Sequence, residues 1–176
     1  MVVLVGYASA HGSTREIAER IAAMLGKHGT RAEARSVDQV QNAADYDVFV
    51  LGSAVHSGAW LREATVFVRR NLSVLADRPV WLFSVGARDA RIGARRGWPA
   101  VYQKEPKEII GLCEAIHPRD HHVFSGAIER DHLPLVGRLI FKGMGGRYGD
   151  FRDWKQIDAW AEDIARDLAA GTHERG

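Results

Sequence analysis

Short apolar runs alternate along the chain with segments in which apolar residues recur every three or four positions. The first run, residues 2–6, is rich in β-branched side chains and is bounded by small and polar residues, as is typical of a buried parallel strand. In residues 14–28 the period changes, and Ile17, Ile21 and Leu25 form one apolar face of a helix. The chain is therefore expected to open with a strand, a loop and a helix.

The same two periods predict strands and helices in alternation along the rest of the chain. Ser13 and Glu16 fit a capping box at the start of the first helix, and Gly29 fits its end. Such alternation favours right-handed crossovers and a parallel sheet that is covered by helices on both faces. No linker divides the chain, so we expect one domain, residues 1–170, and a flexible tail, residues 171–176. The expected strands are residues 2–6, 31–37, 47–53, 79–86 and 121–128, and the expected helices are residues 14–28, 60–75, 106–116, 133–144 and 154–170.

Composition and charge exclude several classes of protein. The 176 residues carry 24 Lys and Arg against 22 Asp and Glu, a balance that does not favour a nucleic-acid binder. The first residues lack the pattern of a signal peptide, so none is expected, and no apolar stretch comes near the roughly 20 residues that span a bilayer. A single cysteine, Cys113, permits no internal disulfide, and His117, His121 and His122 are too few neighbours for a metal site. We expect a cytoplasmic protein.

The loop between the first strand and the first helix has the chemistry of a phosphate site. Ser9, Ser13 and Thr14 supply hydroxyl groups, and Gly12 permits a close approach of the backbone or a positive φ. The free N–H groups at the start of the helix point to the same place. The loop contains no Lys or Arg, and it matches neither the Walker A nor the GxGxxG pattern. It therefore favours a bound monophosphate that is not turned over. The alternative is an ordinary turn in which Ser13 caps the helix.

At this loop the sequence begins to resemble the flavodoxin family, in which the first loop reads roughly T/S-x-T-G-x-T. Ser9, Gly12 and Thr14 match that pattern, and His11 stands where threonine is usual. The resemblance covers nearly the whole chain and is closest to the subgroup that contains the bacterial quinone-dependent protoporphyrinogen IX dehydrogenases. The segments that carry it are VFVLGSAVHSGAW (residues 48–60), SGAI (residues 125–128), LIFKGMGG (residues 139–146) and Asp153-Trp154.

The resemblance implies a flavodoxin-like α/β fold: a five-stranded parallel sheet of order 2-1-3-4-5, helices on both faces, and a long insert before the fifth strand. It also implies FMN as the cofactor, with a related deazaflavin left open, at the carboxyl ends of the strands. No catalytic side chain is implied. The residues implied to contact FMN are Ser9, Ala10, His11, Gly12, Ser13 and Thr14 at the phosphate, Ala54, Val55, His56, Ser57, Gly58 and Trp60 at the isoalloxazine ring, and Ser84, Val85, Gly86 and Arg88 at the pyrimidine side or the ribityl chain.

Two of these residues have an alternative role. Trp60 would stack on the flavin ring or cover its edge, or else pack on the sheet at the start of a helix. His56 would contact the ring or the substrate, or else lie exposed in its loop.

The segment of residues 86–107 is strongly basic. It holds six Lys and Arg against two Asp and Glu, with Trp98 and Tyr102 among them. Because arginine pairs with carboxylates and aromatic rings stack, this segment suits a planar anionic substrate such as a porphyrinogen, and a solvated loop is the alternative. Residues 132–144 are apolar with two basic residues, which suits either peripheral contact with a membrane or a packed helix.

Together these features favour an FMN-dependent oxidoreductase that resembles the quinone-dependent dehydrogenases of heme biosynthesis. The expected partners are a small redox substrate and a quinone, and a homodimer is left open. The alternatives are an electron-transfer protein without its own organic substrate and a flavin-binding regulatory module. Electron-carrying flavodoxins are generally strongly acidic, whereas this chain has a pI of about 8.9, which disfavours the carrier.

Overall fold

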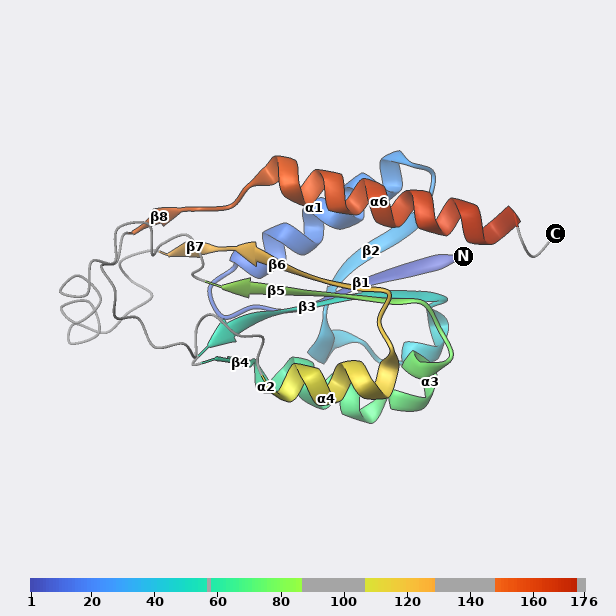
Figure 1. Ribbon diagram of the computed structural model, residues 1–176, viewed down its shortest axis with the longest axis horizontal. Coiled ribbons are helices and arrows are strands. Elements are labelled where there is room, and N and C mark those ends of the chain that lie inside the picture. Colours follow the sequence, from blue (N-terminus) through green and yellow to red (C-terminus); the bar gives the residue numbers. More distant parts are fainter. Residues whose placement is uncertain (57, 87–106, 129–147, 174–176) are drawn as a thin grey trace.

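A parallel sheet lies at the centre of the protein, between two layers of helices (Figure 1). The computed structural model describes residues 1–56, 58–86, 107–128 and 148–173. Its strands are β1 (Val2–Ala8), β2 (Arg31–Ser36), β3 (Val48–His56), β4 (Ala59–Trp60), β5 (Val80–Gly86), β6 (Asp120–Ser125), β7 (Ala127–Ile128) and β8 (Gly149–Asp150). The order of the parallel strands is β2-β1-β3-β5-β6, and β4 pairs only with β3. The five parallel strands follow the expected order 2-1-3-4-5, and the short antiparallel strand β4 adds a sixth strand that was not expected. The fold class is the expected flavodoxin-like α/β fold.

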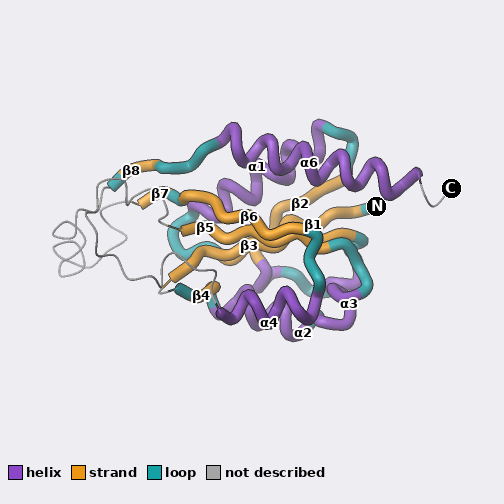
Figure 2. The backbone as a smooth tube through the Cα atoms, viewed as in Figure 1, coloured by secondary structure: helices purple, strands orange, loops and turns teal. Residues whose placement is uncertain are grey.

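Helices cover both faces of the sheet (Figure 2). On one face lie α1 (Ser13–Lys27) and α6 (Trp154–His173), and on the other lie α2 (Arg62–Arg70), α3 (Leu72–Ala76) and α4 (Lys107–Ile116). Two short 3-10 turns, η1 (Val37–Gln39) and η2 (Ala43–Asp45), connect β2 to β3. Within the described ranges, no helix combines the length and the apolar character that crossing a bilayer requires.

The two faces of β1 contribute to two separate apolar cores. Because successive side chains of a strand point to opposite faces, Val3 and Val5 join the core beneath α1 and α6, whereas Leu4 joins the core beneath α2, α3 and α4. All three side chains are fully buried. Burial on both faces explains why this strand is an unbroken apolar run in the sequence rather than an alternating one.

The first helix begins at Ser13 and has no capping box. Gly12 is its N-cap, with a φ of 93°, and no side chain caps the helix. The expected pairing of Ser13 with Glu16 is therefore wrong: Ser13 lies inside the helix, and the Glu16 carboxylate binds Arg152 instead. The other end is as expected, since Gly29 follows the helix with a φ of 80°, a conformation that glycine adopts without strain.

The helix expected over residues 60–75 is wrong at its start and is interrupted in the middle. The two residues of β4 are extended and pair with the end of β3, because the chain folds back there as a hairpin. Asn71 ends α2: its side-chain amide donates a hydrogen bond of 2.8 Å to the Phe67 carbonyl, and its backbone leaves the helical region. The second half of the expected helix is the separate helix α3.

The fifth strand is shorter than expected, because its last residues leave the sheet. β6 ends at Ser125, and β7 pairs with β8 in a separate two-stranded ribbon. Gly126 forms the corner between them: its N–H donates to the Gly86 carbonyl (2.9 Å), and its own carbonyl accepts from the Phe151 N–H (3.3 Å). The ribbon thus returns a late part of the chain to the carboxyl end of the sheet.

The remaining expectations concern the insert, the segment after β7 and the C-terminus. The helix expected over residues 106–116 is confirmed as α4. α6 continues to His173, so the segment expected to be a flexible tail begins as helix. The helix expected over residues 133–144 and the basic residues between 87 and 106 lie outside the described residues.

The ring of Phe83 fills the space beside Gly52 on the neighbouring strand. A Cβ atom at Gly52 would lie only 2.0 Å from Phe83 Cζ. We expect Gly52→Ala to lower the free energy of unfolding by about 2 kcal/mol or more, since a ring in a close-packed core has nowhere to move. Gly26→Ala, in α1 with no atom within 4 Å, is the control and should stabilise by about 0.5–1 kcal/mol. Urea unfolding measures both, and equal midpoints for the two variants would contradict this packing.

Arg20 and Asp158 connect α1 to α6 through two hydrogen bonds of 2.6 Å. These bonds hold the pKa of Asp158 below its ordinary 3.8, because they stabilise the carboxylate form. Such a group adds stability at pH values above its unfolded pKa, and this contribution is lost as the pH falls through the folded pKa.

We therefore expect Asp158→Asn to be less stable than the wild type at pH 7. The difference should shrink once the pH falls below 3.8, where the wild-type carboxylate takes up its proton. Urea unfolding at a series of pH values measures this difference. A difference that stayed constant to the acid end would mean that the ion pair contributes nothing through its charge.

Candidate functional site

Three segments that the sequence places far apart meet at the carboxyl end of the sheet: the loop after β1, the β3–β4 hairpin and the last residues of β5. Parallel pairing sets the three strands in register, since Ala8 lies opposite Ser53 and Ala54 lies opposite Val85. The structure therefore brings together the segments expected at the phosphate, at the flavin ring and at the pyrimidine side. In an open α/β sheet this edge is where ligands bind.

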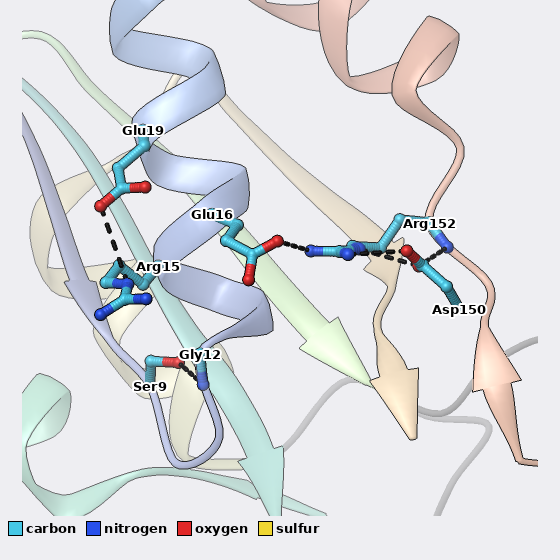
Figure 3. Close-up of polar contacts among 7 residues, drawn as sticks. All are labelled: Ser9, Gly12, Arg15, Glu16, Glu19, Asp150 and Arg152. Atoms are coloured by element: carbon cyan, nitrogen blue, oxygen red, sulfur yellow. Dashed lines mark hydrogen bonds and ion pairs between the residues drawn. The ribbon is translucent and has the colours of Figure 1, made fainter. Parts of the chain in front are cut away.

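The loop after β1 is held by its own hydrogen bonds (Figure 3). Ser9 Oγ accepts a hydrogen bond of 3.0 Å from the Gly12 N–H, and the Gly12 carbonyl accepts from the Glu16 N–H at 3.0 Å. Ala10 and His11, between them, are exposed. The positive φ of Gly12 turns the chain directly into α1, so the first N–H groups of the helix open toward the loop.

Thr14 carries the most informative atom of this loop. Its side chain is fully buried, and its Oγ1 has no hydrogen-bond partner within the described part of the chain. An unsatisfied buried hydroxyl costs about 1–3 kcal/mol, so proteins rarely keep one without a use. The cost is offset if a ligand at the helix N-terminus accepts the hydrogen bond.

Ser13, next to it, lies against the corner at Gly126. A Cβ atom on Gly126 would lie 3.2 Å from Ser13 Oγ and 3.0 Å from Val85 Cγ1. The absence of a side chain at Gly126 thus lets the corner approach the start of α1 and the end of β5 closely. This approach places the corner at the edge of the candidate site.

The loop after β3 is the tip of the β3–β4 hairpin. Ser53 Oγ accepts a hydrogen bond from the Leu61 N–H (3.0 Å) and donates one to the Ala54 carbonyl (2.9 Å), so one buried hydroxyl joins both ends of the hairpin. Gly58 has a φ of 79°, in keeping with its position in the turn, and His56 is exposed. Ser57 lies outside the described residues. The hairpin presents the backbone of residues 54–56 and of Gly58 to the same edge of the sheet.

Trp60 belongs to the core rather than to the surface of the site. Its side chain is 4% exposed, and Nε1 donates a hydrogen bond of 2.8 Å to Ser84 Oγ. Ser84 Oγ in turn lies 2.9 Å from His121 Nε2. Of the two expected roles of Trp60, these contacts support packing on the sheet, and its contact with the flavin stays a prediction. Its place at the end of β4, and not in a helix, is what turns the indole inward.

The last residues of β5 contribute through their backbone. The side chains of Ser84 and Val85 are buried, and Gly86 is half-buried at the edge. Arg88 lies outside the described residues, so its expected role near the flavin stays a prediction. Sequence reasoning did not find the contact of Ser84 with Trp60 and His121, because it joins three strands that no local pattern relates.

A charged cluster beside the phosphate loop was also not expected from the sequence (Figure 3). Arg152 donates to both carboxylate oxygens of Asp150, at 2.8 and 2.6 Å, and to Glu16 Oε2 in the first turn of α1, at 2.5 Å. These hydrogen bonds lower the pKa of Asp150 and raise the pKa of Arg152, since each partner stabilises the charged form of the other. The cluster fixes the ribbon strand β8 to the start of the phosphate loop's helix.

Comparison with known proteins agrees with this geometry. The sequence model of the flavodoxin domain matches residues 4–149. Protoporphyrinogen IX dehydrogenase (quinone) of Escherichia coli strain K12 is 24% identical to this chain. The alignment is 176 positions long and covers 94% of this chain and 95% of that protein.

Solved structures share the fold. A short-chain flavodoxin associated with a non-canonical PDU bacterial microcompartment has a TM-score of 0.64 at 13% identity, covering 95% of this chain and 98% of the flavodoxin. The rubredoxin oxygen:oxidoreductase of Desulfovibrio gigas has a TM-score of 0.59 at 13% identity; it covers 96% of this chain, which spans 36% of that protein. With a family match that runs from the first strand to the last ribbon strand, the chain belongs to the flavodoxin domain family.

Proposed function

We propose that this protein is an FMN-dependent oxidoreductase. Membership of the flavodoxin domain family implies a flavin cofactor, and FMN is the form that the loop after β1 suits best. The observation that carries the proposal is the buried Thr14 hydroxyl, which has no partner among the described residues and lies at the N-terminus of α1. A phosphate oxygen there would satisfy it.

The residues at this end of the sheet fit the phosphate of FMN. The loop offers hydroxyl groups and N–H groups and no Lys or Arg, which suits a permanently bound monophosphate rather than one that is transferred. Ser9, Gly12, Ser13 and Thr14 would hold it. The exposed backbone of the β3–β4 hairpin and of Gly86 would then lie along the ring system.

The flavin would supply the redox chemistry, and the chain would supply position and electrostatics. The Ser53 hydroxyl holds both ends of the hairpin through its hydrogen bonds to Leu61 and Ala54, so the tip is fixed where the reactive edge of the ring would lie. No described side chain at this edge has a role as an acid or a base in our proposal. The six electrons and six protons that a porphyrinogen loses on oxidation would be taken up by three quinones.

The proposed reaction is oxidation of an organic substrate with a quinone as acceptor. It is supported by the relative from Escherichia coli, whose name states that activity and which matches this chain over nearly the full length of both. We propose an anionic porphyrinogen as the substrate, with the basic residues of the 86–107 segment as its docking groups. Peripheral contact with the membrane, where quinones reside, and a homodimer belong to the same proposal.

A second candidate is an electron carrier without its own organic substrate. The shared fold with short-chain flavodoxins favours it. The basic pI of about 8.9 speaks against it, because carriers that dock on basic reductases are acidic. Stoichiometry separates the two candidates, since the dehydrogenase passes electron pairs from substrate to quinone, and the carrier passes single electrons between proteins.

The test is an absorbance spectrum of the purified protein, followed by an anaerobic assay with protoporphyrinogen IX and menaquinone. We expect a flavin spectrum, a released cofactor with the mass of FMN, and formation of one porphyrin per three quinones reduced, because the oxidation removes six electrons and each quinone accepts two. A bound flavin with no turnover of any porphyrinogen would favour the carrier. A colourless protein that does not bind FMN at micromolar concentration would contradict the whole proposal.

Thr14→Val tests two effects of the buried hydroxyl separately: its effect on the stability of the apoprotein and its effect on FMN affinity. Without a ligand, we expect the variant to be more stable by about 1 kcal/mol, because valine removes an unsatisfied polar atom without leaving a cavity. FMN should bind roughly tenfold more weakly, since a hydrogen bond to a charged phosphate contributes about 1.5 kcal/mol or more. Urea unfolding of the apoprotein and fluorescence titration with FMN measure the two effects. A destabilised apoprotein, or unchanged FMN affinity, would contradict the assignment of Thr14.

A further inference from the structure

Arg152 contacts three side chains, Asp150, Glu16 and Trp154, that have no role in the proposed reaction. Its guanidinium makes hydrogen bonds to Asp150 through Nε and Nη2 and to Glu16 through Nη1, and one face lies 4.7 Å from the centre of the Trp154 ring. The side chain is only 11% exposed, in contrast to the surface ion pairs of α1. Such full engagement indicates a position that is fixed before any ligand binds.

Glu16 is the member of this cluster that belongs to α1, the helix whose N-terminus is the proposed phosphate site. It is in the first turn of α1, and its backbone N–H already closes the hydrogen bond to Gly12, the N-cap of the helix. A carboxylate in a first turn is stabilised by the helix dipole, but so is a phosphate, and the two negative charges repel each other when both are present. The loop itself holds no Lys or Arg that would reduce this repulsion.

Among the described residues, Arg152 is the cation that pairs with Glu16. The arginine of the first turn of α1, Arg15, pairs instead with Glu19, one turn further along the helix, at 3.7 Å. Together the Arg152 guanidinium and its two carboxylates carry a net charge of −1, and without Arg152 they would carry −2. This change would fall beside the N-terminus at which the phosphate is expected.

We propose that Arg152 is a positioning residue that sets the preference of the site for a phosphorylated flavin over an unphosphorylated one. It acts through Glu16, whose carboxylate it holds along the flank of α1 and whose charge it compensates. The inference rests on the proposed function, because it presumes that the ligand is a flavin and that its phosphate binds at the start of α1. It assigns to the ribbon strand β8, which ends two residues before Arg152, a part in cofactor recognition.

The consequence is specific to the phosphate. Riboflavin has the same ring system and ribityl chain as FMN but no phosphate, so it does not meet the Glu16 carboxylate as a second anion. Removal of the Arg152 charge should therefore weaken the binding of FMN and leave the binding of riboflavin nearly unchanged. A purely structural role of Arg152 would weaken both ligands together.

The test measures dissociation constants of FMN and riboflavin for the full-length apoprotein, by quenching of flavin fluorescence. We expect Arg152→Gln to weaken FMN by roughly tenfold at low ionic strength and riboflavin by less than about twofold. The loss should diminish in about 0.5 M salt, because added ions screen the exposed Glu16 carboxylate. Adding Glu16→Gln to the Arg152→Gln variant should restore most of the FMN affinity, since it removes the uncompensated charge.

Arg20→Gln is the matched control. It also removes one positive charge and one ion pair between α1 and the C-terminal part of the chain, but one turn further from the helix N-terminus. We expect it to change the ratio of the two dissociation constants by less than about threefold. Circular dichroism of each apoprotein establishes that the variants are folded.

The outcomes separate the inference from its premise. Equal weakening of both ligands in Arg152→Gln, or no rescue by Glu16→Gln, would overturn the role of Arg152 and leave the proposed function intact. A wild-type protein that binds neither FMN nor riboflavin would overturn the proposed function and the inference with it. A wild type that binds both equally well would overturn the phosphate site.

Discussion

Parallel pairing of β1 with β3 and β5 is the constraint on which the rest of the structure depends. A parallel ladder places the carboxyl ends of neighbouring strands at one edge, and helices on both faces leave that edge as the place where loops of different strands meet. The fully buried side chains of β1 stabilise this arrangement, because they pack into both apolar cores. The site is therefore built of backbone groups and small side chains, because the large ones are committed to the cores.

The order of strands and helices is predictable from the sequence because each element is set by its own local pattern. The apolar runs of β1 and β5 and the four-residue period of α1 need no knowledge of the rest of the chain. The errors occur where distant residues decide. Trp60 is extended because β4 pairs with β3, and Gly126 ends β6 because it binds both Gly86 and Phe151. Asn71 is a different case: its side chain competes for a backbone carbonyl within an otherwise continuous helical pattern.

The candidate site likewise contains one part that can be predicted from the sequence and one part that only the fold reveals. The loop from Ser9 to Thr14 is contiguous, so its hydroxyl groups, its glycine and the helix that follows can be recognised together. The contacts of Trp60 and of Arg152 join segments that are far apart in sequence: Arg152 lies 136 positions from Glu16. The burial of the Thr14 hydroxyl belongs to the same class, because only the packed fold reveals that no described group reaches it.

The β7–β8 ribbon has a consequence for changes in chain length. Ile128 and Gly149 are paired partners, so the two positions that flank residues 129–147 in the sequence lie side by side. Because these two ends are already held together, each doubling of the number of residues between them would add only about 0.6 kcal/mol of closure entropy. Insertions and deletions between the two positions are therefore compatible with an unchanged ribbon.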